Sequence, residues 1–238
     1  MARIAPDGYD VLVHMLSDSA GTHINAGTAG STGNFTDYGS PVFGCSGLLG
    51  DAMYSPGYYL VNARNGTGGA NDVLVTPNVS LSGWVFMRRS TNSAAEIFNK
   101  QYFLNGWSAP FLTFGFQTHS ASDQCDLYIT IGGVLQTVLR TPTTYPLPIS
   151  RWFHLGGTWD GTTVKFYING NLSTSANYSG TIDYGTVGNR GQWYVGGIPG
   201  TTVNADSPTI VQDVRIANIV RPQSYFQNIY YNGMFVNG

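Results

Sequence analysis

The sequence predicts an all-β protein in which two antiparallel sheets pack face to face as a sandwich, with one short helix near the C-terminus. Apolar and polar residues alternate along many short stretches at the period-2 spacing typical of strands. Turn residues separate these stretches at roughly the spacing, about 8–14 residues, that sandwiches and barrels use. Glycine accounts for 31 of the 238 residues, which suits many turns and disfavours long helices.

Residues 151–170 give the clearest local signal, two strands joined by a tight turn. Asp160-Gly161 and Asn169-Gly170 supply the positive φ angles of tight turns, so both ends of the second strand are marked. In the second strand we expect a half-buried pattern, with Val164, Phe166 and Ile168 on one face and Lys165 and Tyr167 on the other. The preceding strand places Phe153, Leu155 and Trp159 on one face and Trp152, His154 and Thr158 on the other.

The N-terminal third is less regular. Residues 9–16 predict a first strand and residues 57–61 a second. Between them, residues 17–50 are dense in Gly, Ser, Thr and Asn, which predicts a long turn-rich stretch. We therefore expect the first 80 residues to consist largely of long loops.

From residue 79 onward the strand pattern is tighter. Gly132-Gly133 predicts a two-residue hairpin, and Pro222 suits the first turn of a closing helix over 221–230. The remaining predicted strands are 81–88, 97–100, 111–116, 126–131, 134–139, 193–197 and 211–218. No internal repeat or second domain is visible, so residues 1–238 are expected to form a single domain.

Composition restricts the partners of the chain. Charged residues make up 10% of the sequence, against an ordinary share of about 25%. An uncharged surface rich in Tyr suits protein interfaces and sugar binding equally well. The net charge of −2, without any basic run, disfavours nucleic acid as a partner.

The sequence shows neither a signal peptide nor a membrane span. Residues 1–7 lack an apolar core, and no run approaches the roughly 18 apolar residues that a membrane span requires. We therefore expect a chain made in the cytoplasm. Cys45 and Cys125 stand far apart; a disulfide is one option, and two buried thiols are favoured in a reducing compartment.

Residues 151–170 also resemble the signature hairpin of the laminin G-like, concanavalin A-like jelly rolls. The positions of that signature are filled here by Trp152, His154, Trp159, Asp160, Gly161, Tyr167, Ile168, Asn169 and Gly170. The strands at 81–88, 193–197 and 211–218 are similar to other strands of the family. The resemblance covers 81–231 well and implies a concanavalin A-like jelly roll with a divergent N-terminal part, residues 1–80.

Catalysis is not expected. Glycosidases use two carboxyl groups, and the glucanase branch of these jelly rolls presents them as Glu-x-Asp-x-x-Glu on one strand. This chain has a single glutamate, Glu96, with no second carboxylate in its strand. Polysaccharide lyases on related jelly rolls combine Gln-x-His with a Tyr base and an Arg-bearing strand, and none of the histidines lies in that full pattern; these are His14, His23, His119 and His154. His119, in Gln117-Thr118-His119-Ser120, comes nearest and is interpreted as a loop histidine.

The resemblance implies one cofactor, a structural calcium ion held by aspartate and carbonyl oxygens. Asp213 corresponds to the aspartate of the family's penultimate strand, and Asp18 lies where a second ligand could approach it. Val214 replaces the usual Glu, which removes one ligand. The alternative is a surface aspartate paired with Arg215. No other cofactor is expected.

A sugar site needs an exposed aromatic ring beside amide and hydroxyl groups. Trp107 with Asn105 offers this combination, and Asn189 with Arg190 forms a second candidate. The other tryptophans are assigned to the sandwich itself; these are Trp84, Trp152, Trp159 and Trp193.

Single laminin G-like domains without a signal peptide are often found among bacteriophage structural proteins. The resemblance and the low charge therefore predict a non-enzymatic virion protein, associated with capsid or tail. We expect it to assemble with itself, as a trimer, and with other virion proteins, and to bind host-surface glycans. One alternative is a soluble carbohydrate-binding module or lectin; another is a divergent glycan-cleaving enzyme.

Overall fold

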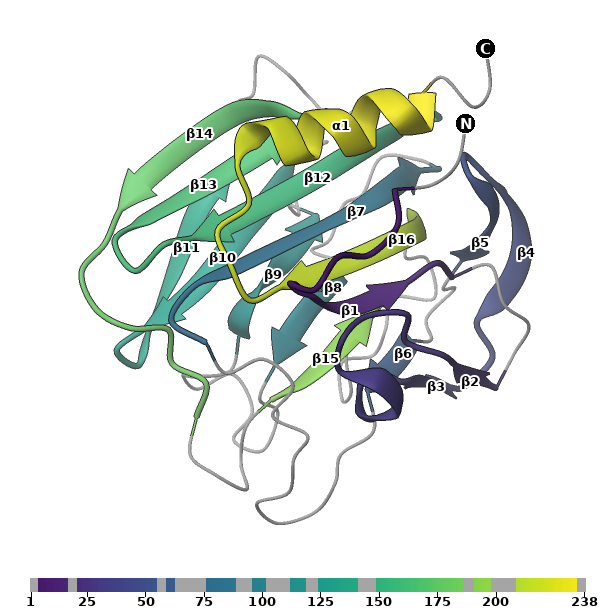
Figure 1. Ribbon diagram of the computed structural model, residues 1–238, viewed down its shortest axis with the longest axis horizontal. Coiled ribbons are helices and arrows are strands. Elements are labelled where there is room, and N and C mark those ends of the chain that lie inside the picture. The colour runs from purple at the N-terminus through teal and green to yellow at the C-terminus, as the bar shows by residue number, and fades with distance from the viewer. Residues whose placement is uncertain are drawn as a thin grey trace.

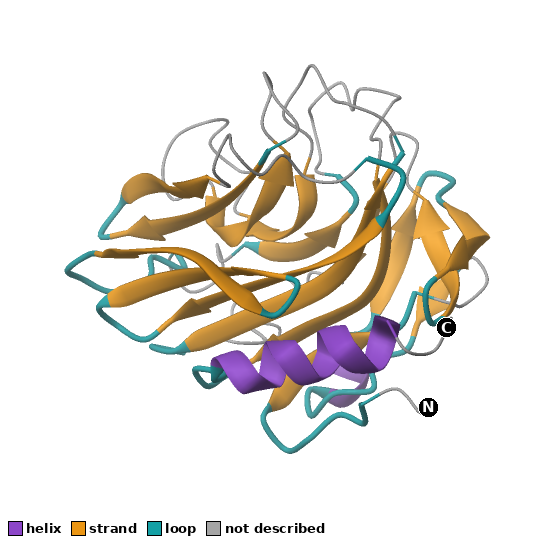
Figure 2. Ribbon diagram, turned by 90° about the horizontal axis from the view of Figure 1, so that it is seen from above, coloured by secondary structure: helices purple, strands orange, loops and turns teal. Residues whose placement is uncertain are grey.

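The computed structural model describes residues 4–16, 21–54, 59–62, 76–88, 96–101, 112–118, 124–140, 149–185, 191–197 and 209–234. Two antiparallel eight-stranded sheets and one C-terminal helix confirm the predicted sandwich. Figure 2 shows the sheets as two layers, with the helix α1 (Gln223–Met234) lying against one of them. No helix in the described part of the chain is long and apolar enough to cross a membrane.

Sheet A is the layer that carries the helix (Figure 1). Its strands, in spatial order, are β14 (Asn171–Asn177), β13 (Thr163–Ile168), β12 (Trp152–Trp159), β7 (Val79–Met87), β16 (Thr209–Ala217), β5 (Gly50–Tyr54) and β4 (Val42–Gly47). The first strand, β1 (Asp10–His14), pairs with β16 outside this path.

Sheet B forms the second layer. Its strands, in spatial order, are β11 (Val134–Arg140), β10 (Cys125–Ile131), β9 (Leu112–Thr118), β8 (Glu96–Gln101), β15 (Gln192–Val195), β6 (Tyr59–Asn62), β3 (Phe35–Tyr38) and β2 (Thr22–His23). A short 3-10 helix, η1 (Gly30–Gly33), precedes β3.

The core lies between the inner faces of the two sheets. Phe98 and Phe116 of sheet B meet edge to face with ring centroids 5.0 Å apart, and Phe166 of sheet A lies 5.3 Å from Phe116. Burial of such aromatic side chains dominates the stability of a sandwich. Trp159 and Trp193, assigned to the sandwich from the sequence, belong to this core.

The hairpin predicted at 151–170 is confirmed as β12 and β13, with Gly161 and Asn169 at positive φ in its turns. Its predicted inner faces do lie in the core. The expectation of a solvent-exposed outer face was wrong. Tyr167 is only 4% exposed because its ring stacks on Phe226 of α1, 4.6 Å between centroids.

Two glycines allow α1 to approach sheet A closely. A methyl group at Gly156 of β12 would lie 2.7 Å from the ring of Phe226. On the helix side, a methyl group at Gly233 would overlap the indole of Trp84. The helix therefore seals a second apolar layer, in which His154 lies between Trp84 and Phe226.

The stretch predicted to be turn-rich, residues 17–50, also contains short strands that the sequence did not predict. The described part, 21–50, contains β2, η1, β3 and β4 and the first residue of β5. These strands are two to six residues long and rich in Gly and Thr, so their alternation is too short to recognise in the sequence. Tertiary contacts fix them instead: the amide oxygen of Asn25 accepts hydrogen bonds from the backbone of Val13 and Gly27.

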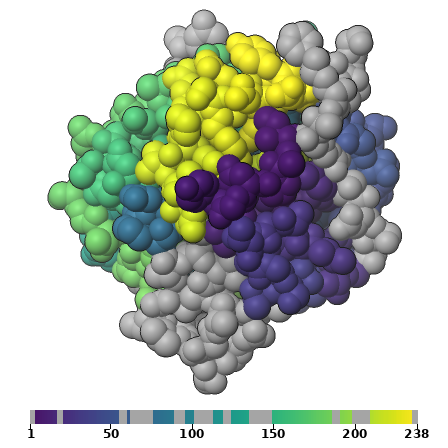
Figure 3. Space-filling model, viewed as in Figure 1, coloured from purple at the N-terminus to yellow at the C-terminus, as the bar shows by residue number. Residues whose placement is uncertain are grey.

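The two ends of the chain are joined by ion pairs, a buried one between Arg221 and Asp10 and a partly exposed one between Arg221 and Asp7. The guanidinium of Arg221 donates to Asp7 at 2.6 and 2.7 Å and to Asp10 at 2.5 Å. In Figure 3 the N-terminal atoms lie directly against those of the C-terminal segment. The helix begins at Gln223, two residues later than predicted, and it continues to Met234.

Both cysteines are free thiols. Cys125 is buried, as expected, whereas Cys45 is half-exposed on β4, the last strand in the order of sheet A. The sequence therefore predicted the redox state of the pair correctly and the burial of Cys45 incorrectly.

Candidate functional site

The residues predicted to bind sugar, Trp107, Asn105, Asn189 and Arg190, lie outside the described residues. The strands that flank them are described, and they are neighbours. Residues 102–111 follow β8, residues 186–190 precede β15, and Gln101 of β8 is paired with Gln192 of β15. The described strands next to the two predicted segments are therefore neighbours in sheet B, and the two sugar-binding candidates stay predictions.

A polar cluster lies on the outer face of sheet B, the face turned away from sheet A. The phenol of Tyr128 on β10 donates a 2.8 Å hydrogen bond to Oε2 of Glu96 on β8. The amide nitrogen of Asn99, also on β8, donates to the same oxygen at 3.1 Å. Tyr128 and Asn99 are buried, and Glu96 retains 9% exposure. Figure 1 shows β8, β9 and β10 side by side in the rear layer.

A β-bulge places Glu96 and Asn99 on the same face. In a regular strand, residues three apart point to opposite faces. Here Glu96 pairs with Gln117 and Phe98 with Phe116, so Ile97 is an extra residue in β8. Ile97 and Phe98 both point into the core, which returns Asn99 to the outer face.

Gly115 makes room for the contact between strands. It lies on β9, between the two strands of the cluster, and is paired with both Asn99 and Tyr128. A methyl group at Gly115 would overlap the Cβ of Asn99. Because the glycine has no side chain, Tyr128 can reach across β9 to the carboxyl group of Glu96.

Burial controls the ionisation of this cluster. Desolvation raises the pKa of Glu96 from 4.5 to about 7, although the hydrogen bonds from Tyr128 and Asn99 act in the opposite direction. Burial likewise raises the pKa of Tyr128 well above its ordinary value, so the phenol stays a donor. A carboxyl group with such a raised pKa is a recognised marker of functional sites.

Two polar atoms at this site are unsatisfied. Asn99 Oδ1 and Thr113 Oγ1 are buried and have no hydrogen-bond partner among the described residues. Thr113 is an extra residue in β9, since Lys100 pairs with Phe114 and Gln101 with Leu112. It thus lies at the end of sheet B from which the predicted sugar-binding segments start. Unpaired buried oxygens are rare and call for a ligand or an ordered water.

The pairing of strands also brings a second carboxyl group to this face. Asp126 of β10 is paired with Gln117, which is paired with Glu96. Two strand spacings separate the backbones of Asp126 and Glu96, roughly 10 Å. Because Asp126 lies on a different strand from Glu96, the spacing of residues within one strand does not reveal it. Asp126 is 1% exposed.

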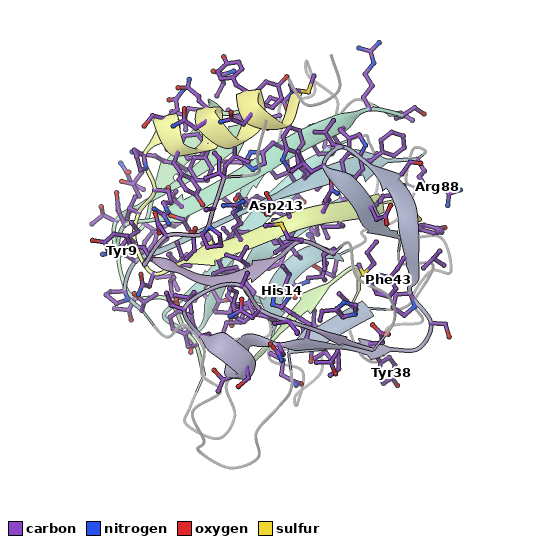
Figure 4. All side chains as sticks on the ribbon, turned by 45° about the vertical axis from the view of Figure 1, so that its right-hand side comes forward. Tyr9, His14, Tyr38, Phe43, Arg88 and Asp213 are labelled. Carbon is purple, nitrogen blue, oxygen red and sulfur yellow. The ribbon has the colours of Figure 1, made fainter. Side chains whose placement is uncertain are left out.

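Asp213, one of the two predicted calcium ligands, is engaged by an arginine. Arg215 donates to its two carboxylate oxygens at 2.9 and 3.1 Å, which supplies the positive charge that a cation would bring. The partner foreseen in the sequence alternative is thus right, but Asp213 is 2% exposed and not on the surface. Figure 4 shows it well inside the outline of the molecule, unlike Tyr38 and Arg88.

The other predicted ligand, Asp18, lies outside the described residues. Within the described ranges, no three His, Cys, Asp or Glu side chains gather in a way that could hold a metal ion. The arrangement around Asp213 does not fit a calcium ion, and the role of Asp18 stays a prediction.

Solved structures with a similar fold include a domain of an arabinanase and domains of bacterial toxins. Domain 4 of AbnA, an extracellular arabinanase from Geobacillus stearothermophilus solved with arabinotriose, aligns with a TM-score of 0.64 at 16% identity, over 93% of this chain and 98% of that one. The binding domain of Paraclostridial Mosquitocidal Protein 1 aligns with a TM-score of 0.67 at 10% identity, over 94% of this chain and 52% of that one.

The receptor binding domain of botulinum neurotoxin D gives a TM-score of 0.64 at 14% identity, over 94% of this chain and 53% of that one. The chain thus spans about half the length of these toxin domains. A comparison with curated proteins gave no match.

The family comparison agrees with the fold. A family model described as the concanavalin A-like lectin/glucanases superfamily matches residues 63–224, more than half of the chain. The match includes the signature hairpin and the strands that carry Glu96, Asn99 and Tyr128. The chain belongs to the concanavalin A-like lectin/glucanases superfamily.

Proposed function

We propose that this chain is a non-enzymatic binding module that holds a glycan on the outer face of sheet B. One observation carries the proposal: Asn99 Oδ1 is buried without a partner beside the hydrogen-bonded carboxyl group of Glu96, and Thr113 Oγ1 is a second unpaired buried oxygen further along the same part of sheet B. Sugar hydroxyls are the donors that such oxygens lack. Amide, hydroxyl and carboxyl groups in one place are the polar set that fixes a sugar in a binding site.

The fold supports this proposal. A structural neighbour over almost its whole length was solved with arabinotriose, and other neighbours are receptor-binding domains. The carbohydrate-binding type of fold and the polar outer face of sheet B are therefore both consistent with a glycan ligand. The predicted Trp107 segment, which starts at the same end of sheet B, would add the aromatic ring that sugar binding uses.

Binding without cleavage is the second part of the proposal. Retaining glycosidases hold their two carboxyl groups about 5 Å apart, and inverting ones hold them within roughly 6.5–9.5 Å. Glu96 and Asp126 stand on strands separated by the whole of β9, and the carboxyl group of Glu96 is engaged by Tyr128 and Asn99. We expect the purified chain to release no reducing ends from β-glucans, arabinans or alginate. Release by the wild-type chain that disappears in Glu96→Gln would show instead that the chain cleaves glycans.

The setting that we propose is a bacteriophage particle, on capsid or tail, with the chain assembled as a trimer. Its support is compositional: charged residues make up 10% of the sequence, as at packed interfaces. Light scattering and mass spectrometry of purified particles test it. A stable monomer that is absent from particles would favour the alternative, a free lectin.

The decisive experiment uses an isosteric change at the site. Thr113→Val removes the unsatisfied hydroxyl and keeps the shape of the side chain. A glycan array followed by calorimetric titration should show binding weakened about tenfold, while stability stays equal or rises because an unpaired buried hydroxyl is gone. Thr158→Val, which removes a buried hydroxyl from sheet A, is the matched control and should leave binding unchanged. Unaltered binding in Thr113→Val would refute the site.

A further inference from the structure

We infer that Glu96 and Asn99 form a donor–acceptor pair that recognises one neutral sugar hydroxyl and rejects a ligand carboxylate at the same position. This inference rests on the proposed function, since it concerns the same face of sheet B. It assigns a ligand class, neutral glycans, and a specific role to each of the two residues.

The hydrogen bonds of the cluster assign the two roles. Tyr128 and Asn99 both donate to Oε2 of Glu96, so Oε2 acts as an acceptor and the proton of the neutral acid belongs on Oε1. Asn99 uses its amide nitrogen for Glu96, which leaves Oδ1 as the unpaired acceptor. The 3.1 Å contact holds the carboxyl and amide groups together, so this donor and this acceptor are neighbours.

A hydroxyl group matches the pair because it can accept from Oε1–H and donate to Oδ1 at the same time. A carboxylate can only accept hydrogen bonds. It would satisfy Oε1–H but would face Asn99 Oδ1 with a second acceptor, and it would add a negative charge beside Glu96. Unpaired polar groups of this kind produce strong discrimination between otherwise similar ligands.

Access to the pair is through Glu96. It keeps 9% exposure, whereas Asn99, Thr113 and Tyr128 are 0–1% exposed. The ligand hydroxyl therefore meets Glu96 first, and local opening must accompany its contact with Asn99 Oδ1. Such tightening on binding is common for polar sites in ligand-free proteins.

The pair functions only while Glu96 is neutral. The titratable groups around Glu96 are Tyr128 and Asp126 from β10, Tyr194 from β15 and Cys125 on the core side of β10. The ammonium group of Lys100 on β8 donates to the carbonyl of Gly191. Burial raises the pKa of Glu96 to about 7, so the donor at Oε1 is present below that pH and lost above it. Affinity for a neutral glycan should then fall above pH 7, approaching about tenfold for each pH unit.

The test uses calorimetric titration between pH 6 and pH 9 with two probes, arabinotriose and a trimer of galacturonic acid. A neutral trisaccharide that the glycan array selects takes the place of arabinotriose. The wild-type chain should bind the neutral probe at pH 6, lose affinity above pH 7, and bind the acidic probe at least about tenfold more weakly at pH 6. Glu96→Gln keeps a neutral donor at every pH, so its affinity should not change with pH. Glu96→Asp keeps a titrating carboxyl group and serves as the control.

The failures can be told apart. A wild-type affinity that does not change with pH, or equal affinity for the two probes, overturns the donor–acceptor pair and leaves glycan binding intact. Absence of binding to any glycan on the array overturns the proposed function itself. A readout without ligand is also available, because Glu96 is the only glutamate of the chain. With ¹³C-labelled glutamate, its carboxyl carbon gives a single NMR signal, and a midpoint near 4.5 would overturn the inference.

Discussion

Replacing Glu96 by Gln should stabilise the protein, and increasingly so as the pH rises. Glutamine has the same shape, can still accept the hydrogen bonds from Tyr128 and Asn99, and carries no ionisable group. In the folded chain the neutral acid is favoured, since burial raises the pKa of Glu96 from 4.5 to about 7. The stabilising contribution of Glu96 is therefore complete below the unfolded value of 4.5 and is lost as the pH rises through 7.

The size of the effect follows from these two pKa values. Each pKa unit corresponds to about 1.4 kcal/mol, so ionised Glu96 lowers the free energy of unfolding by roughly 3 kcal/mol at pH 8 and by about 1 kcal/mol at pH 5. The difference between Glu96→Gln and wild type should thus grow by roughly 2 kcal/mol across this range. Other titrating groups are common to both proteins and cancel in the difference.

Urea unfolding at several pH values measures this difference directly, provided that the denaturant slope is the same for both proteins. Thr158→Val is a suitable control, because its effect on stability should not depend on pH. A Glu96→Gln effect that is constant from pH 5 to pH 8 would refute the conclusion that the fold holds this carboxyl group in a neutral state.

Three further outcomes are expected. Tyr128→Phe removes a hydrogen bond that lowers the pKa of Glu96, so the NMR midpoint of the single glutamate should move above 7; a downward movement would contradict the cluster geometry. Gly156→Ala places a methyl group against Phe226 and should cost about 1–3 kcal/mol in denaturant unfolding. Gly8→Ala, where no atom lies within 4 Å, should be neutral. Burial lowers the pKa of His154 from 6.5 to about 3, so its contribution to stability is lost as the pH falls below 6.5. The stability of His154→Leu relative to wild type should therefore rise by about 2 kcal/mol as the pH is lowered from 7 to 5. An equal loss of unfolding free energy in both proteins over this range would contradict the burial of a neutral imidazole.

The sequence predicted those parts of the fold whose signals are local. The turn at Asp160-Gly161 needs positive φ and alternating residues around it, and both are visible in the sequence. The short N-terminal strands have no such signal, because Asn25 and their pairing partners fix them only after the chain has folded. The start of α1 was placed too early because Pro222 marks a helix start, whereas the pairing of Arg221 with Asp7 is not visible in sequence order.

The candidate site was harder to predict than the fold. Glu96 was noted as the single glutamate, but strand alternation would have put it on the opposite face from Asn99. The bulge at Ile97 changes that phase, and bulges have no reliable sequence signal. Tyr128 and Asp126 reach the same face only through the register of β8, β9 and β10, which one sequence cannot reveal.

The pairing of β1 with β16 has a consequence for biosynthesis. The ribosome produces Asp10–His14 almost two hundred residues before the partner strand Thr209–Ala217. Until that partner leaves the exit tunnel, the earliest strand and the carboxylates of Asp7 and Asp10 have neither their backbone partners nor Arg221. Completion of the sandwich must therefore wait until Thr209–Ala217 has left the exit tunnel, and nascent chains stalled before residue 209 should remain sensitive to protease at their N-terminal end.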